Sequence, residues 1–185
     1  MPRKGDVRAR LQEAALDLYG ERGFEKTTTA QIAERAGVTE RTYFRHFADK
    51  REVLFDGEAK LDAALTRAMA EVPRELGPLD ALRRAFLAVE GPLAENRSVA
   101  GPRHAVIERT PALRERELAK VASLTQKLAA LLQRRGMAAQ PAMLAAQVGM
   151  AAFTQAAVRW LEASEKHFAA ELDEAFDALR QLAAS

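Results

Sequence analysis

The segment from Ala36 to Lys50, with the sequence AGVTERTYFRHFADK, concentrates side chains that can bind nucleic acids. It holds three aromatic rings within five residues, interleaved with nitrogen-rich groups. An arginine can donate two hydrogen bonds to the O6 and N7 atoms of guanine, and Arg41 is the candidate for that contact. Phosphate oxygens suit the other polar groups of the segment, which are Thr42, Arg45, His46 and Lys50. Together these residue types predict a surface that contacts DNA.

Helical geometry separates the aromatic residues into two groups. Tyr43 and Phe47 are four residues apart and share one face of a helix, whereas Phe44 lies about 100° around the helix from Tyr43. We therefore expect Tyr43 and Phe47 in a small core that also contains Ile32, Ala33 and Val38. The outer face then carries Phe44, Arg41 and Glu40. Glu40 can serve there as a base reader or as a partner of the helix dipole.

Three helices are expected to position this surface. A stripe of apolar residues at spacings of four and three predicts the first, from Val7 to Gly20 or Gly23. Thr28 and Gln31 form a capping box that opens a short second helix, which stops at Gly37. Thr39 is the expected N-cap of the third helix, and both capped ends suit phosphate oxygens. Two short helices joined by AGVT are typical of a helix-turn-helix, whose second helix enters the major groove.

The remaining chain is also predicted to be helical, and no stretch alternates long enough to form a strand. A capping box at Asp49 and Glu52 predicts a long helix to about Ala70. Further helices are expected at residues 79–95, with a kink or early end at Gly91 and Pro92, and at 102–109, 111–135, 141–163 and 167–183. The fold class is thus all-α with about nine helices. We expect a DNA-binding domain at residues 1–50 and a second helical domain at residues 51–185, whose effector-binding and dimerisation roles are implied by the family resemblance described below.

Composition excludes several classes of protein. The chain has 185 residues, no cysteine and a net charge of +2, so disulfides, thiolate metal sites and cysteine nucleophiles are excluded. The N-terminus lacks the apolar region of a signal peptide, and no apolar run approaches the ~20 residues of a membrane span. A cytoplasmic protein without membrane contact is therefore expected.

The residues from Gly23 to Phe55, GFEKTTTAQIAERAGVTERTYFRHFADKREVLF, resemble the signature of the TetR family of bacterial transcriptional regulators. The shared features are Gly-aromatic, Thr-Thr, Ile-Ala, Ala-Gly-Val, Thr, two large side chains, His-Phe, and then Lys and Leu. The resemblance implies an N-terminal helix-turn-helix domain, C-terminal helices that hold a small-molecule pocket and a dimer interface, and repression as the usual outcome.

Three positions depart from the family pattern. Phe44 stands where the family usually has tyrosine, so it lacks the hydroxyl that contacts the DNA backbone, although it can touch a thymine methyl. Arg41 stands where small residues are common, so its base contact is an inference from this sequence. Thr29 replaces an apolar residue and adds a second hydroxyl near phosphate, beside Thr28.

The long C-terminal helices are expected to bind a small, largely apolar effector. Methionine and aromatic residues suit an adaptable pocket, and Phe86, Met150 and Phe153 are candidates. Polar groups on these helices can orient a ligand or simply form surface or core hydrogen bonds, and they are Asn96, His104, Glu108, Gln155 and Arg159. His104 and Glu108 are four residues apart, but two ligands do not make a metal site. No metal and no cofactor is expected.

The last two helices carry a pattern that fits either a core or a dimer interface. Small residues recur at Ala145, Gly149, Ala152 and Ala156, and an apolar stripe runs through Phe168, Leu172, Phe176 and Leu179. A homodimer built from these helices would present two recognition helices to a palindromic operator of double-stranded DNA. The alternatives are a helical adaptor, which would not need the recognition-helix chemistry, and a helical enzyme. No phosphate loop, serine elbow or carboxylate–histidine cluster supports an enzyme.

Overall fold

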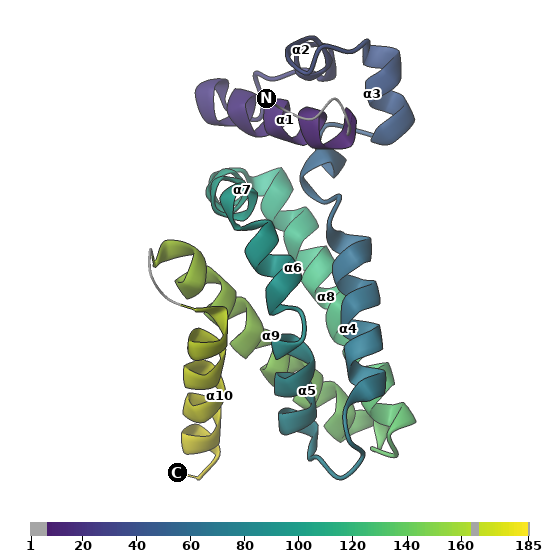
Figure 1. Ribbon diagram of the computed structural model, residues 1–185, viewed down its shortest axis with the longest axis vertical. Helices are drawn as coiled ribbons and strands as arrows, with labels where there is room; N and C mark the ends of the chain where they lie inside the picture. Colours follow the sequence, from purple (N-terminus) through teal and green to yellow (C-terminus); the bar gives the residue numbers. More distant parts are fainter. Residues whose placement is uncertain (1–6, 164–166, 185) are drawn as a thin grey trace. The chain divides into compact units, whose positions relative to one another are not determined.

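The computed structural model describes residues 7–163 and 167–184, and within these ranges the chain is helical without a strand (Figure 1). This confirms the predicted all-α fold, with ten α-helices and one 3-10 helix in place of about nine helices. Their bounds are α1 Val7–Arg22, α2 Thr29–Arg35, α3 Glu40–His46, η1 Glu52–Leu54, α4 Glu58–Glu71, α5 Pro78–Leu87, α6 Glu90–Glu95, α7 Arg97–Arg109, α8 Pro111–Arg134, α9 Ala139–Glu162 and α10 Phe168–Ala184.

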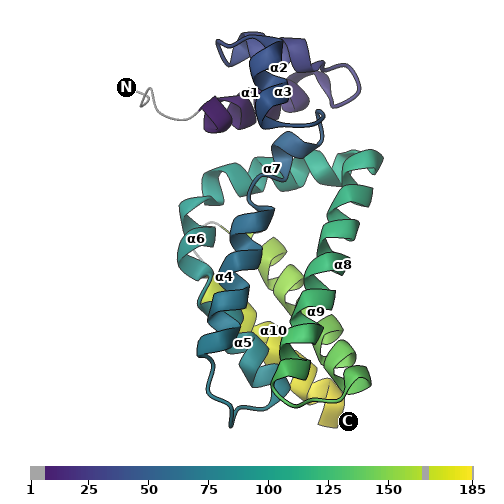
Figure 2. The same cartoon turned by 90° about the vertical axis from the view of Figure 1, so that its right-hand side faces the viewer.

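The chain forms two compact units, and the first is not continuous in sequence. It contains the residues up to Glu58 together with Ser98–Glu117, whereas the second contains Ala59–Arg97 and the chain from Leu118 onward. Ile107 of α7 and Leu113 of α8 are buried in the same apolar cluster as the helix-turn-helix. Figure 2 shows α7 meeting the start of α8 at a corner. Residues 98–117 are therefore part of the unit that carries α1, α2 and α3.

Local capping signals produce the short helices of the first unit. The Thr28 hydroxyl accepts a hydrogen bond from the backbone N–H of Gln31, and the Gln31 side chain accepts from the N–H of Thr28, so the predicted capping box is present. Thr39 caps α3 by accepting from the N–H of Thr42. Tyr43 and Phe47 are buried at 0% and 4% exposure, as their spacing predicted.

The predicted helix from Asp49 to Ala70 is wrong at its beginning. Asp49 does accept hydrogen bonds from the N–H groups of Arg51 and Glu52, but it starts only the short helix η1. Val53 and Leu54 in η1, and Phe55 directly after it, are all buried in the core of the first unit. The helix ends where Phe55 is buried between the guanidinium groups of Arg103 and Arg116. The regular helix α4 begins only at Glu58.

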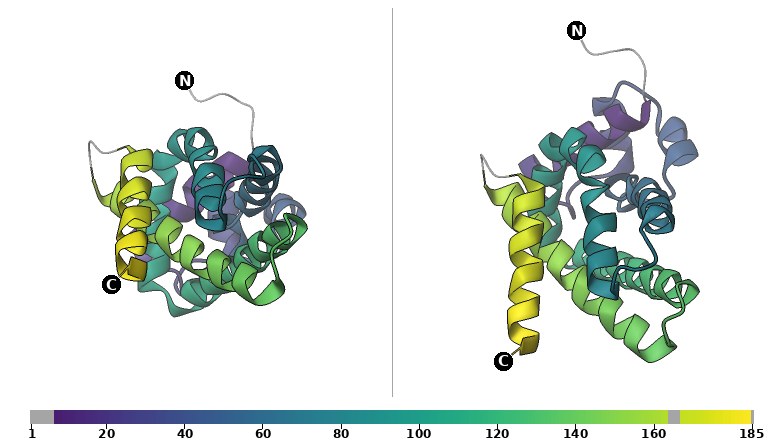
Figure 3. Two further views of the ribbon diagram at one scale, coloured as in Figure 1. Left: turned by 90° about the horizontal axis from the view of Figure 1, so that it is seen from below. Right: turned by 60° about the horizontal axis from the view of Figure 1, so that its bottom comes forward.

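In the second unit, α10 packs along α9 and α5 (Figure 3). The small residue Gly149 permits a close approach, because a Cβ atom there would lie 2.7 Å from Cδ1 of Leu82 on α5. The predicted helix at residues 79–95 ends at Leu87, and α6 follows separately. Pro92 falls in the first turn of α6, where its missing N–H removes no intrahelical hydrogen bond.

The apolar stripe of α10 is part of the chain's own core. Phe168, Leu172 and Phe176 are each 0% exposed within a single chain. The small residues of α9 are buried with them, at Ala145, Gly149, Ala152 and Ala156. These residues therefore cannot form the dimer interface directly, and of the two alternatives the structure supports the core.

Within the described residues, α9 is the one helix with the length and mean hydropathy of a membrane span, although no such segment was expected from the sequence. Nine of its residues are buried in the protein, among them Met150, Phe153 and Trp160. These buried residues pack in the core of the second unit.

Gly37 in the helix-turn-helix adopts a φ of +68°, which an L side chain rarely adopts. Gly37→Ala should therefore lower the stability of the first unit by about 1–2 kcal/mol, measured by chemical denaturation. Gly20→Ala is the matched control, since Gly20 lies inside α1 and a Cβ atom added there would meet nothing within 4 Å. That control should leave stability unchanged or raise it by up to about 1 kcal/mol. Equal losses in both variants would contradict the assigned conformation.

Candidate nucleic-acid interface

The outer face of α3 presents the side chains that the sequence predicted for it. Glu40, Arg41 and Arg45 are exposed, and Phe44 is 52% exposed. The Phe44 ring meets the buried Tyr43 ring edge to face, with centroids 5.6 Å apart. Thr42 is half-buried. A short helix with a buried aromatic face and an exposed face of guanidinium groups can offer hydrogen-bond donors to the edges of bases and to phosphates.

Threonine hydroxyl groups organise the ends of α2 and α3. Thr28 and Thr39 accept capping hydrogen bonds, and a hydroxyl that accepts can still donate its proton. The hydroxyls of Thr39 and Thr42 lie 3.0 Å apart. Thr29 donates its proton to Oε1 of Glu40 at 2.5 Å. The Thr29 proton is therefore engaged within the protein, whereas the departure from the family pattern at this position predicted a second hydroxyl near phosphate.

Lys50 and His46 are less exposed than the arginines of α3. The Lys50 ammonium donates to the carbonyl oxygen of Phe24 at 2.9 Å and to that of Thr27 at 3.4 Å, and it lies 4.1 Å from the centre of the Phe24 ring. The buried Nε2 atom of His46 has no hydrogen-bond partner among the described residues. Both side chains are half-buried, so each offers less to a phosphate than the exposed arginines do.

Lys50→Met should act on stability more than on DNA binding. The change removes the hydrogen bonds and the ring contact that fasten Lys50 to the loop between α1 and α2, so the melting temperature of the protein should fall. The dependence of DNA affinity on salt should stay unchanged, because no phosphate contact is lost. A fall in the salt slope of about one per subunit without a fall in melting temperature would instead show a phosphate contact.

Two buried tyrosines fix the chain that follows α3. The hydroxyl of Tyr43 donates to the carbonyl oxygen of Asp49 at 3.0 Å, and that of Tyr19 on α1 donates to the carbonyl oxygen of Lys50. Burial raises the pKa of both hydroxyls above the ordinary value, and nearby charges add to this. Both tyrosines therefore remain protonated donors, and they hold the recognition helix against α1.

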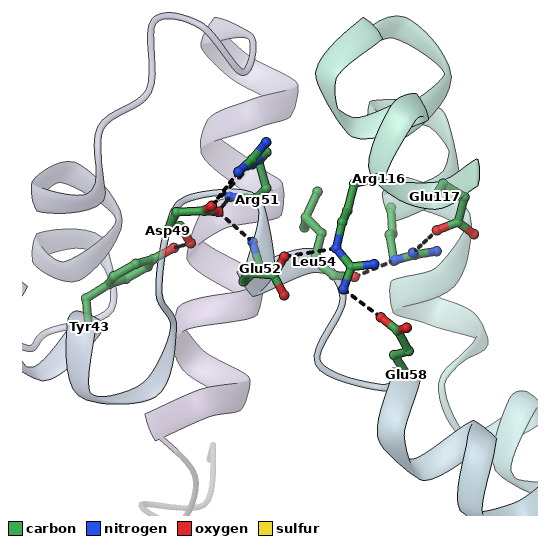
Figure 4. A network of polar contacts seen from close by, with 9 residues as sticks. Tyr43, Asp49, Arg51, Glu52, Leu54, Glu58, Arg116 and Glu117 are labelled. Carbon is green, nitrogen blue, oxygen red and sulfur yellow. Dashed lines mark hydrogen bonds and ion pairs between the residues drawn. The ribbon is translucent and has the colours of Figure 1, made fainter. Parts of the chain in front are cut away.

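A network of ion pairs joins this segment to the corner between α7 and α8 (Figure 4). Arg116 on α8 donates to Glu52 at 3.0 Å and to Glu58 at 2.8 Å. Arg103 on α7 donates to the carbonyl oxygen of Leu54 at 2.6 Å and to Glu117 at 2.7 Å. No sequence pattern indicated this network, because Arg103 and Arg116 lie 49 to 64 residues from their partners Leu54, Glu52 and Glu58.

Phe55 lies at the centre of the same network. The Arg103 and Arg116 guanidinium carbons lie 5.0 and 4.9 Å from the centre of its ring. Guanidinium groups at this range interact favourably with the face of an aromatic ring. The corner between α7 and α8 is thus fastened to the segment that follows the recognition helix by ionic and aromatic contacts together.

In the second unit, α8 and α9 line an open hollow of about 600 Å³. Three of the predicted effector residues, Met150, Gln155 and Arg159, line it. Sequence reasoning missed the other lining residues, which are Val121, Thr125, Gln147, Ala151, Thr154 and Val158. Four of them, Gln147, Ala151, Thr154 and Val158, recur at spacings of four, three and four along α9, which is the signal that could have identified them.

The other predicted effector residues lie elsewhere. Phe86 and Phe153 are buried in the core with ring centres 4.7 Å apart. Asn96 is exposed, and its amide donates to the carbonyl oxygen of Pro92. His104 and Glu108 belong to the first unit, on α7. Among the described residues, no group of three or more His, Cys, Asp or Glu side chains could hold a metal.

Comparisons with known proteins agree with these features. Residues 11–56 match the sequence pattern of bacterial regulatory proteins of the tetR family, and residues 76–184 match the MftR C-terminal domain. The transcriptional regulator TcmR of Streptomyces glaucescens is 40% identical over 113 residues, which cover 58% of this chain and 50% of that protein. TtgR of Pseudomonas putida is 38% identical over 87 residues, 45% of this chain and 41% of that protein. The matched part of this chain thus spans half the length, or less, of these curated relatives.

Solved structures share the fold over nearly the whole chain. The Thermus thermophilus repressor FadR, solved with lauroyl-CoA, aligns with a TM-score of 0.56 and 24% identity over 93% of this chain and 92% of that one. SmeT, solved with triclosan, aligns with a TM-score of 0.65 and 21% identity over 93% and 90% of the two chains. With the helix-turn-helix and both sequence matches in place, the chain belongs to the TetR family of bacterial transcriptional regulators.

Proposed function

We propose that this regulator is a ligand-responsive repressor that binds a palindromic operator as a homodimer and is released by a small apolar effector. The observation that carries the proposal is the exposed polar face of α3, held against α1 by Tyr43 and Tyr19. A two-fold dimer would place two such helices in major grooves about one turn (~34 Å) or a multiple apart. A gel shift with the DNA that flanks its own gene tests this, and the absence of any specific shift would contradict it.

The exposed residues at the start of α9 and at the end of α10 are the proposed contact with a second copy. Leu144 on α9 and Leu182 on α10 are large apolar side chains that are 61% and 75% exposed. Helices α9 and α10 pack along each other, so a two-fold dimer could cover Leu144 and Leu182 in one contact of four helices. This retains the predicted use of the last two helices but moves the contact away from the buried stripe of α10.

The hollow lined by α8 and α9 is the proposed effector site. Its lining combines apolar side chains such as Val121 and Met150 with the polar groups of Thr125 and Gln155, a mixture that binds and orients small ligands. The ligands named for FadR and SmeT, lauroyl-CoA and triclosan, both carry apolar groups and support the choice of an apolar effector class. A thermal-shift screen of lipophilic compounds, followed by gel shifts with each hit, is the appropriate search.

A bulky residue in the hollow should separate specific binding from general adsorption. Ala151→Trp should abolish the thermal shift produced by a true effector, because Ala151 lines the hollow. Ala130→Trp is the matched control, since Ala130 is an exposed residue of α8 outside the lining. Hits that shift both variants equally, or that leave operator affinity unchanged, would contradict an effector role for this site.

Helix α8 is the proposed route from the effector to the DNA. Its residues 111–117 belong to the first unit and those from Leu118 belong to the second. Arg116 pairs with Glu52 and Glu58, while Val121 lines the hollow little more than one turn further along α8. A ligand that favours another position of α8 would shift the population away from the DNA-bound state, limited by its differential affinity.

A further inference from the structure

An acidic residue occupies the first position of the recognition helix, where the phosphates of bound DNA would repel its negative charge. Glu40 begins α3 and is exposed next to Arg41. Its Oε1 atom accepts a hydrogen bond from the hydroxyl of Thr29, the first residue of α2. Oε2 has no hydrogen-bond partner among the described residues. The side chain is thus held by one oxygen and open at the other.

A carboxylate has acceptors only and needs a donor on the DNA. In the major groove, cytosine presents its N4 amino group, and Glu or Asp side chains accept from it. Adenine also has an amino group, but its N7 acceptor lies beside it and repels a carboxylate. Guanine and thymine present acceptors at the corresponding positions. The chemistry of Glu40 therefore selects cytosine.

The hydrogen bond from Thr29 restricts the rotamers of the Glu40 side chain, which an isolated glutamate on a surface samples freely. A free glutamate samples many rotamers and loses this freedom when it binds a base. The Thr29 hydroxyl restricts the side chain before DNA arrives, and it also links the first turns of the two helices that form the motif. We propose that Thr29 is a positioning residue that holds Glu40 as a reader of one cytosine in each operator half-site, an inference that rests on the proposed operator binding.

Three variants isolate this contact. Thr29→Val removes the hydroxyl and keeps the branched shape, Thr29→Ser keeps the hydroxyl, and Glu40→Gln replaces the carboxylate with an amide. Glutamine forms two hydrogen bonds with the N6 and N7 atoms of adenine. The alternative role for Glu40, interaction with the dipole of α3, would change stability without changing base preference.

The experiment is selection of bound sequences from a library of randomised operators, followed by titration of single-base variants. The wild type should prefer cytosine at one position per half-site by about tenfold or more. Glu40→Gln should move that preference to adenine. Thr29→Val should reduce the cytosine preference several-fold at an unchanged melting temperature, and Thr29→Ser should retain it.

The outcomes distinguish this inference from the proposed function. Specific binding by the wild type without a cytosine preference, or with a preference that Glu40→Gln leaves in place, would overturn the Glu40 assignment alone. An equal loss of the cytosine preference in Thr29→Ser and Thr29→Val would overturn the positioning role of the hydroxyl. If Thr29→Val does not fold, Thr29→Ala removes the same hydroxyl in its place, and Glu40→Gln still tests the base assignment. Absence of any sequence preference in the wild type would overturn the proposed operator binding itself.

Discussion

Leu172→Glu should unfold the second unit rather than produce a folded monomer. Leu172 on α10 is 0% exposed within one chain and belongs to the buried apolar core of the second unit. The change both removes an apolar side chain from the core and buries a carboxylate without a partner. Changes of this kind lower the free energy of unfolding by about 3–5 kcal/mol. The expected result is loss of cooperative thermal unfolding and of helical circular dichroism, together with loss of DNA binding.

Leu182→Glu is the control that separates the core from the interface. Leu182 lies on the same helix but is 75% exposed, so the variant should keep the helical spectrum and cooperative melting. Analytical ultracentrifugation should show a lower sedimenting mass, and operator affinity should fall with it. A folded Leu172→Glu monomer would contradict the burial of the stripe. A Leu182→Glu variant that remains dimeric would contradict the proposed interface.

Arg41→Ala should weaken operator binding by about 1–3 kcal/mol per half-site and relax the preference at one base position. The structure exposes Arg41 in the first turn of α3, and none of the described residues holds its guanidinium in a hydrogen bond or an ion pair. The guanidinium is therefore available to the O6 and N7 atoms of guanine. Affinity for random DNA should change much less, as measured by parallel titrations on operator and scrambled sequences.

Arg45→Ala provides the comparison for a phosphate contact. Arg45 lies in the last turn of α3, and it is also exposed. Its removal should weaken operator and random DNA alike and lower the salt slope by about one per subunit. If Arg41→Ala behaved in the same way, with equal losses on both kinds of DNA, Arg41 would be a phosphate contact and not a base reader.

Local signals explain why the helix-turn-helix could be predicted from the sequence. The capping residues Thr28 and Thr39, the turn glycine Gly37 and the spacing of Tyr43 and Phe47 act within a few residues of one another. The local structure around each of these residues can therefore be predicted from the neighbouring sequence alone. Periodicity alone predicted only the lengths of the C-terminal helices. The resemblance to the family added how these helices fold together.

Contacts between distant segments explain the parts that could not be predicted. The apolar stripe of α10 looks the same in sequence whether α5 and α9 or a second chain covers it, and only the packing distinguishes them. From the sequence, Lys50 is expected to be a free cation, whereas in the structure its ammonium group donates hydrogen bonds to the carbonyl oxygens of Phe24 and Thr27. The early end of the helix after Asp49 depends likewise on where Phe55 is buried, between Arg103 and Arg116.

Operator recognition by a dimer is best tested by footprinting the wild-type protein on the DNA that flanks its own gene, with the mass of the complex determined in parallel. We expect an imperfect palindrome protected as two half-sites, about one helical turn or a multiple apart, by a complex that contains at least one dimer. A single unrepeated half-site protected by a monomer, or protection without sequence preference, would show that the proposed mode of binding is wrong.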